Sequence, residues 1–223
     1  MQTFDTPAAV SAVLALPAGR IRLVAADRAD TTVEVLPADA SKSRDVKAAE
    51  QVEVAFADGV LRIGTAAAKH RILGDSGSVE VTVHLPAGSA VEATAAAAEF
   101  HGSGRLGDVA FDGAQATVAL DETAGARVTL QDGGVSIGRL GGSARISTMR
   151  GDIDIAEAVA GTVTLTTQQG SISVAAAPGV SASLDAGTAS GRITNTLRNA
   201  DGAAAGLTFH ATTAQGDITA RGL

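Results

Sequence analysis

"GDIDI" (residues 151–155) and "GSISV" (residues 170–174) decide the fold. Each unit begins with glycine and then alternates a polar residue with a branched apolar residue. Related units occur along the second half of the chain: "GDVAF" (107–111), "GGVSI" (133–137), "GRITN" (191–195) and "GDITA" (216–220). From Gly133 onward the unit returns after 18, 19, 21 and 25 residues. A glycine unit that returns at a nearly fixed short period is typical of a repeat protein.

A second series of glycines lies 8 to 12 residues ahead of the first and also precedes short alternating runs. Its members are Gly125, Gly142, Gly161, Gly179 and Gly206. Each repeat therefore contains two strands and two glycine turns, which predicts stacked coils of about 20 residues, a β-solenoid in which no coil is stable alone. The expected inward side chains are Val109, Val128, Leu130, Val135, Ile137, Ile146, Ile153, Ile155, Val163, Leu165, Ile172, Val174, Leu184, Ile193 and Ile218.

The first 88 residues show a different pattern, with few glycines and strict alternation of apolar and polar residues. The alternating runs are "RIRLVA" (20–25), "TTVEVLP" (31–37), "QVEVAF" (51–56), "VLRIG" (60–64) and "SVEVTVHLP" (78–86). This pattern predicts half-buried strands. Asp58-Gly59 predicts a hairpin, and Pro17, Pro37 and Pro86 are expected at strand ends. No strong helix is predicted anywhere in the chain.

These patterns predict an all-β chain that forms one continuous elongated domain. Residues 1–88 are expected to form an N-terminal antiparallel β cap, and residues 89–223 a β-solenoid with glycine at its corners. Within the solenoid, "NTLRNADGAAAG" (195–206) interrupts the glycine spacing with small and polar residues. We expect this stretch to be a surface insertion.

The order of these motifs resembles a known family. Alternating N-terminal strands, then "VHLPAGS" (83–89), then repeated "GDIDI" and "GSISV" units are similar to the bacterial β-strand-repeat family of unknown function labelled "putative adhesin". The similarity extends over nearly the whole chain. It implies a β-solenoid capped by β strands, and it implies no catalytic residues.

Composition and charge argue against several classes of function. The net charge is −7, Tyr and Trp are absent, and all three lysines lie in the first third of the chain. A nucleic-acid partner is therefore not expected, because binding of phosphates needs cationic side chains and stacking of bases needs aromatic ones. The absence of cysteine excludes disulfides and thiolate metal sites, and no cofactor is predicted.

The N-terminal segment and the hydropathy bear on location. "MQTFDTPAAVSAVLALPAG" (1–19) lacks the basic start of a secretory signal, and no run reaches the roughly 20 apolar residues that span a bilayer. Direct membrane insertion is not expected. We expect a cytoplasmic protein, with association to the cell envelope through a partner as the alternative.

The outward face of the coils carries the candidate functional residues. Asp152 and Asp154 form the only same-face carboxylate pair that the first glycine series places in one coil. A pair of carboxylates can serve catalysis or metal binding. The alternative is that the two side chains are simply part of a solvated row of polar residues. We define a candidate surface patch by five residues of successive coils: Asp152, Asp154, Ser171, Ser173 and Arg192. No catalytic, cofactor-binding or metal-binding residue is predicted.

Three other features of the sequence are weaker candidates for functional sites. The histidines are scattered without metal-ligand spacing: His70, His84, His101 and His210. The basic clusters "SKSRDVK" (41–47) and "KHR" (69–71) are expected in solvated loops, where they could contact an acidic partner. Arg150-Gly151-Asp152 spells an integrin-binding tripeptide, but Gly151 belongs to the glycine series, so its neighbours occupy variable outward positions of a turn.

The function that fits these observations is a non-enzymatic, adhesin-like scaffold or protein-interaction module. Two alternatives stay open. One is a self-assembling filament protein, since the last coil, "GDITARGL" (216–223), would leave an open sheet edge. The other is a polysaccharide-active β-solenoid enzyme that would use Asp152 and Asp154. Small-molecule ligands are not indicated by any motif.

Overall fold

The computed structural model describes residues 1–65 and 77–223, and this part of the chain is nearly all-β, as predicted. Its sixteen strands are accompanied by one short α-helix and one 3₁₀ turn. The chain divides into two compact units, Met1–Ala116 and Thr117–Leu223. The long strand β7 (Ala90–Asp132) begins in the first unit and ends in the second.

The first unit contains seven strands. They are β1 (Gln2–Asp5), β2 (Ser11–Ala26), β3 (Asp30–Pro37), β4 (Val52–Ala57), β5 (Val60–Thr65), β6 (Val79–Pro86) and the start of β7. All five alternating runs predicted as strands lie in these elements. The pairs β1–β3, β3–β6 and β4–β5 are antiparallel, as expected of the cap. The prediction of a wholly antiparallel layer was wrong, however, because β2 runs parallel to β5, β6 and β7.

Pro17 lies inside β2 and not at a strand end. The first part of β2 pairs with β5 as far as Ala15, and its last part pairs with β6 from Gly19 onward. Pro17 therefore occupies the interval between these two partners. Because proline has no N–H to donate, it is tolerated where a neighbouring strand is missing. Pro37 and Pro86 do end β3 and β6, as predicted.

The hairpin predicted from Asp58-Gly59 is confirmed. These two residues connect β4 to β5, and both have positive φ, 52° for Asp58 and 75° for Gly59. Positive φ at both central residues is the requirement of a type I′ turn, whose twist matches that of the two strands.

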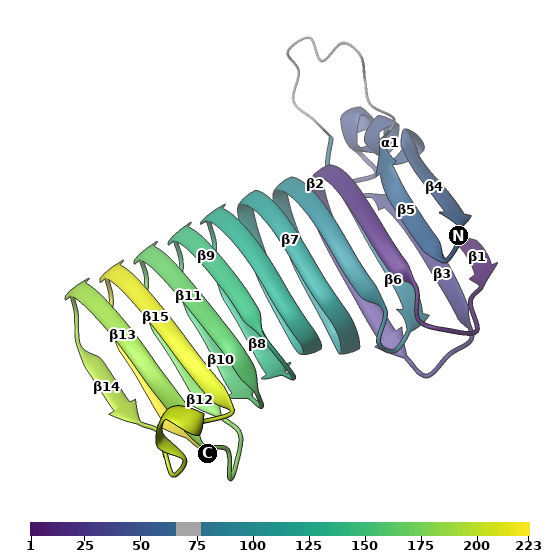
Figure 1. The fold of residues 1–223 in the computed structure, drawn as a ribbon. Coiled ribbons are helices and arrows are strands. Elements are labelled where there is room, and N and C mark those ends of the chain that lie inside the picture. Colours follow the sequence, from purple (N-terminus) through teal and green to yellow (C-terminus); the bar gives the residue numbers. More distant parts are fainter. Residues whose placement is uncertain (66–76) are drawn as a thin grey trace. The chain divides into compact units, whose positions relative to one another are not determined.

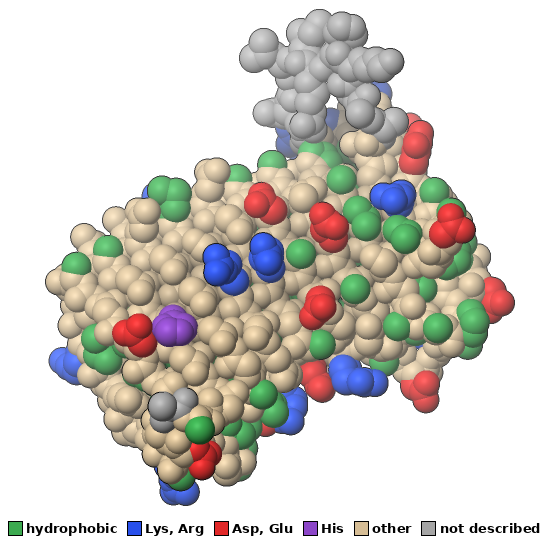
Figure 2. Space-filling model, viewed as in Figure 1, with side chains coloured by type: hydrophobic (Ala, Val, Ile, Leu, Met, Phe, Trp, Pro, Cys, Tyr) green, Lys and Arg blue, Asp and Glu red, His purple; other side chains and the backbone are tan. Residues whose placement is uncertain are grey.

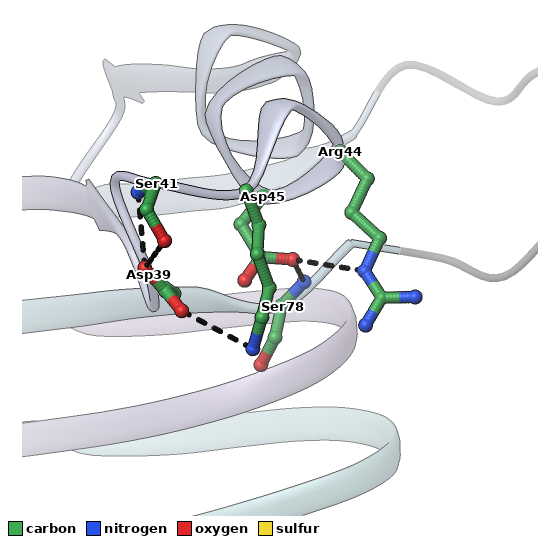
Figure 3. Close-up of polar contacts among 6 residues, drawn as sticks. Asp39, Ser41, Arg44, Asp45 and Ser78 are labelled. Carbon is green, nitrogen blue, oxygen red and sulfur yellow. Dashed lines mark hydrogen bonds and ion pairs between the residues drawn. The ribbon is translucent and has the colours of Figure 1, made fainter.

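The loop expected at residues 41–47 was wrong, because the short helix α1 (Ser43–Glu50) begins there and packs against β3 and β6. Its Arg, Lys, Ala and Glu residues favour helix, and alternation of apolar residues is absent there. The buried Asp45 accepts a hydrogen bond from the Ser78 N–H at 2.9 Å and lies 3.8 Å from Arg44 Nε (Figure 3). In the described part of the chain, no helix has the length and hydrophobicity that a bilayer crossing requires.

The cations of the 41–47 cluster have acidic neighbours. Lys42 Nζ lies 3.2 Å from Asp39, whose carboxylate also accepts hydrogen bonds from the Ser41 hydroxyl and N–H (Figure 3). These hydrogen bonds and the ammonium group lower the pKa of Asp39 to about 2. Arg44 lies beside Asp45. The second basic cluster, residues 69–71, lies outside the described residues.

The second unit is a stack of coils with two rows of parallel strands, which we call row I and row II. Row I contains the end of β7, β9 (Ala144–Arg150), β11 (Gly161–Gln169), β15 (Leu207–Gln215) and β13 (Ala182–Ser190). Row II contains an earlier part of β7, β8 (Val135–Leu140), β10 (Ile153–Ala158), β12 (Ile172–Ala176), β16 (Ile218–Gly222) and β14 (Ile193–Thr196). Two strands per repeat are what the doubled glycine spacing predicted.

The order of the last two coils differs from the order in the sequence. The C-terminal coil, β15 and β16, lies between the coil of β11 and β12 and the coil of β13 and β14 (Figure 1). The residues predicted as an insertion, 195–206, include the end of β14 and the 3₁₀ turn Gly202–Ala204, and they lead the chain back to this inner position. The expected open edge at residues 216–223 is therefore wrong, because the edge coil is formed by β13 and β14.

The corner glycines form a column whose order follows the coils: Gly133, Gly151, Gly170, Gly216 and Gly191. Their φ values lie between 129° and 154°, a conformation that L side chains rarely adopt. A Cβ added to Gly151 would overlap the carbonyl oxygen of Gly133, and one added to Gly170 would overlap that of Gly151. Glycine is therefore required at this corner both by backbone conformation and by close approach of the next coil.

The predicted core is confirmed except at two positions. Thirteen of the fifteen side chains expected to point inward are buried, but Leu184 is only partly buried and Ile193 is 43% exposed. Both exceptions lie in β13 and β14. Within residues 1–65 and 77–223 no further coil lies beside the edge coil, so its inward side chains are covered by a neighbouring coil on one side only.

Candidate functional site

The predicted surface patch lies on row II, where successive coils expose one polar side chain at matching positions. Asp154 of β10 pairs directly with Ser173 of β12, between residues whose side chains are buried, such as Ile153 and Ile155. Alternation along a strand therefore turns Asp154 outward. Thr219 of β16 pairs in turn with Ser173.

These pairings continue from β8 to β14 and form what we call the hydroxyl row, which ends at Ala119 of β7. Its members, in spatial order, are Ser136, Asp154, Ser173, Thr219 and Thr194. Paired residues of neighbouring strands are separated by about 4.8 Å, so the row is a straight, regularly spaced line of short polar side chains. Four of its five members carry a hydroxyl, which can both donate and accept a hydrogen bond.

Asp152 has a structural role at the corner. Its Oδ1 accepts a hydrogen bond from the Ser171 N–H of the next coil at 2.7 Å. Asp217 repeats this arrangement, since its Oδ1 accepts from the Arg192 N–H at 2.7 Å. The aspartate after a corner glycine thus satisfies a backbone donor of the neighbouring coil, and Asp152 is not a free partner for Asp154.

Arg192 is not adjacent to Ser171, although the two follow each other in successive glycine units of the sequence. The C-terminal coil lies between them, so that the Ile172 N–H donates to Asp217 O and the Ile218 N–H donates to Arg192 O. The structure therefore brings Asp152, Asp154, Ser171 and Ser173 together. It places Arg192 two coils beyond Ser171, beside Asp217.

The acidic and histidine residues do not gather into a metal site in the part of the chain that the structure describes. Within residues 1–65 and 77–223, no three His, Cys, Asp or Glu side chains are close enough to hold a metal ion. His210 lies on β15 with its Nδ1 3.3 Å from Asp185 Oδ2, and both side chains are exposed. An isolated exposed pair of this kind is an ordinary surface interaction.

A column of threonines at the corner was not predicted from the sequence. Thr148, Thr167, Thr213 and Thr188 each lie three residues before a corner glycine, and their hydroxyls donate to corner carbonyls of neighbouring coils, Gly133, Gly151, Gly170 and Gly216. The first three are buried. The sequence does contain the pattern Thr-x-x-Gly in four repeats. Alternation of apolar and polar residues does not, however, indicate which group of the neighbouring coil a threonine hydroxyl would contact.

One family model and two solved structures are similar to this chain. The model of the family described as Toastrack DUF4097 matches residues 12–221. A "putative adhesin" from Bacteroides fragilis is similar in structure, with 13% identity, a TM-score of 0.53, and coverage of 98% of this chain and 95% of that one. A "putative cell adhesion protein" from Clostridium sporogenes has 12% identity, a TM-score of 0.40, and coverage of 100% and 98%.

The similarity to the Bacteroides fragilis structure supports the fold alone, because the two sequences are only 13% identical. Among curated proteins, none matches the chain in sequence.

Proposed function

The chain belongs to the Toastrack DUF4097 family, and from this premise we propose that it is a non-enzymatic, adhesin-like scaffold that binds a protein partner through the hydroxyl row. The observation that carries the proposal is the row itself, because strand pairing holds five short polar side chains in one line. Preorganised groups bind without the entropy cost of ordering a flexible surface.

The chemistry of the row favours a protein partner. Short hydroxyl side chains let a partner's backbone come close, and each can adapt as donor or acceptor. Asp154 is the only acidic member, so the row would select a partner by the positions of its hydrogen-bonding groups more than by its charge. Buried isoleucines on both sides of Asp154 anchor the strand that presents it.

Site-specific photo-crosslinking in the native cell tests this proposal. A photoreactive amino acid in place of Ser173 or Thr219 should give a discrete adduct, and the same amino acid in place of the exposed Thr166 of β11 is the control. An adduct from row II positions alone would support the proposal. Absence of any adduct, or equal adducts from Thr166, would contradict it.

The non-enzymatic part of the proposal has its own test. The purified chain is incubated with polyuronides in the presence and absence of calcium, and release of reducing or unsaturated ends is measured. No release is expected, because Asp152 is engaged by the Ser171 N–H and offers Asp154 no catalytic partner. Turnover that Asp154→Asn abolishes would overturn this expectation.

Self-assembly is a second candidate function, favoured by the edge coil. All four residues of β14 are exposed, and Ile193 is apolar. In inner coils the N–H of the corner glycine and of the residue two positions later donate to the next coil, as Gly216 and Ile218 do. Gly191 and Ile193 have no such coil in the described chain, and an open strand edge can pair with another molecule.

Sedimentation velocity over a wide concentration range tests self-assembly. Association that grows with concentration is expected, and Ile193→Lys should abolish it because a charge on an edge strand opposes pairing. Arg198→Lys, which keeps charge in the nearby connection, is the control. A single monomeric species at every concentration would remove this candidate.

A further inference from the structure

Two arginines lie side by side on row I. Arg127 at the end of β7 pairs directly with Arg145 of β9, and both side chains are exposed. Neighbouring strands are about 4.8 Å apart, so two full positive charges are held close together on a chain whose net charge is −7. Like charges at directly opposed positions destabilise a sheet.

Two other arginines of the second unit, Arg139 and Arg150, are paired with acids across the strands. Arg139 of β8 lies between Glu122 and Glu157 and forms an ion pair with Glu157. Arg150 lies 2.8 Å from Asp132. For Arg127 and Arg145, by contrast, residues 1–65 and 77–223 supply no ion pair.

The surroundings of the two guanidinium groups are rich in hydroxyls. Both arginines line an open hollow of about 280 Å³ together with Ser143, Thr162 and Thr164. Thr164 pairs directly with Arg145, and the Ser143 oxygen accepts a hydrogen bond from the Thr162 N–H at 3.1 Å, which leaves the Ser143 O–H free to donate.

Toward the C-terminal coils, the first acid in line with the two arginines is Asp185, which already contacts a histidine. Figure 2 shows two cationic side chains together on this face, and further along a histidine beside an acidic side chain. In the strand register the order is Arg127, Arg145, Thr164, His210 and Asp185. Asp185 is thus three strands from Arg145 and lies against His210.

We propose that Arg127 and Arg145 form a binding site for a phosphate or sulfate group. Guanidinium groups bind such oxyanions through paired, charge-assisted hydrogen bonds. A doubly charged tetrahedral anion between the two arginines would neutralise their repulsion, and the hydroxyls of Ser143 and Thr164 would supply further donors. Because the hollow is open, the group fits either as a free ion or as an ester on a polysaccharide.

This site is independent of the proposed function, which concerns row II. Arg127 and Arg145 belong to row I strands, whereas the hydroxyl row lies on β8, β10, β12, β16 and β14. Failure of either proposal leaves the other unaffected.

The test follows the Nε–Hε signals of the arginines by NMR at low ionic strength. The full chain is titrated with inorganic phosphate, inorganic sulfate, dextran sulfate and uncharged dextran. Saturable shifts of Arg127 and Arg145 are expected with at least one anionic probe and none with dextran. Arg127→Ser and Arg145→Ser should weaken binding about tenfold or more, as loss of a charge-assisted hydrogen bond does.

Arg150→Ser is the matched control, since it also removes one exposed positive charge but from an arginine paired with Asp132. Its binding should stay within about twofold of the unmodified chain. Binding of dextran sulfate alone assigns the site to polymer-borne esters, and equal binding of the free ions assigns it to inorganic anions. No saturable shift with any probe, or equal weakening by Arg150→Ser, would overturn the proposal.

Discussion

Gly151 illustrates, at the scale of one residue, why the corner tolerates no side chain. With a φ of 138° and the Gly133 carbonyl in the place of a Cβ, Gly151→Ala should cost both backbone strain and a steric clash. We expect a loss of about 3 kcal/mol or more in the free energy of unfolding.

Gly179→Ala is the control for this prediction. Gly179 also has a positive φ, 79°, but open space where its Cβ would lie. It should lose only about 1 to 2 kcal/mol, the cost of the left-handed conformation. Chemical denaturation measures both variants. Equal losses would mean that close packing of the coils contributes nothing at Gly151.

Thr167 tests the threonine column. Thr167→Val keeps the shape of the buried side chain but removes the hydroxyl that donates to Gly151 O at 3.1 Å. Loss of this donor should lower the free energy of unfolding by about 1 to 3 kcal/mol. Thr166→Val, at the neighbouring exposed position, should change it by less than about 0.5 kcal/mol. Similar denaturation midpoints for the two variants would contradict a role of the column in stability.

At the scale of the strand, Phe209 and Leu184 distinguish an inner coil from the edge coil. The two residues pair directly, yet Phe209 of β15 is fully buried whereas Leu184 of β13 is not. Phe209→Ala should therefore cost about 3 to 5 kcal/mol, and Leu184→Ala about 1 to 2 kcal/mol. If the C-terminal coil were at the end of the stack, the larger cost would fall on Leu184→Ala. Urea unfolding of both variants decides between the two orders.

The strands also show what sequence can and cannot predict. Glycine spacing and alternation predicted the coils, because a sharp corner needs glycine and a half-buried strand needs period 2. Spacing carries no information on the order of similar coils, since strands such as β13 and β15 offer equivalent backbone partners to β11.

The candidate sites, like the order of the coils, could be predicted only in part from the sequence. The outward position of Asp154 follows from alternation. The bond of Asp152 to Ser171 and the pairing of Arg127 with Arg145 depend on the register between coils, which the period of the repeat does not specify.

At the scale of the whole molecule, each compact unit has its own buried side chains, and each coil contacts mainly its neighbours. In such a stack destabilisation should stay local. Native-state hydrogen exchange of Phe209→Ala should show lost protection in β11, β15 and β13, with little change in β3 and β6 of the first unit. Leu23→Ala, a fully buried residue of β2, should give the reverse pattern. Uniform loss of protection over both units, from either variant, would instead mean that the chain unfolds as one cooperative body.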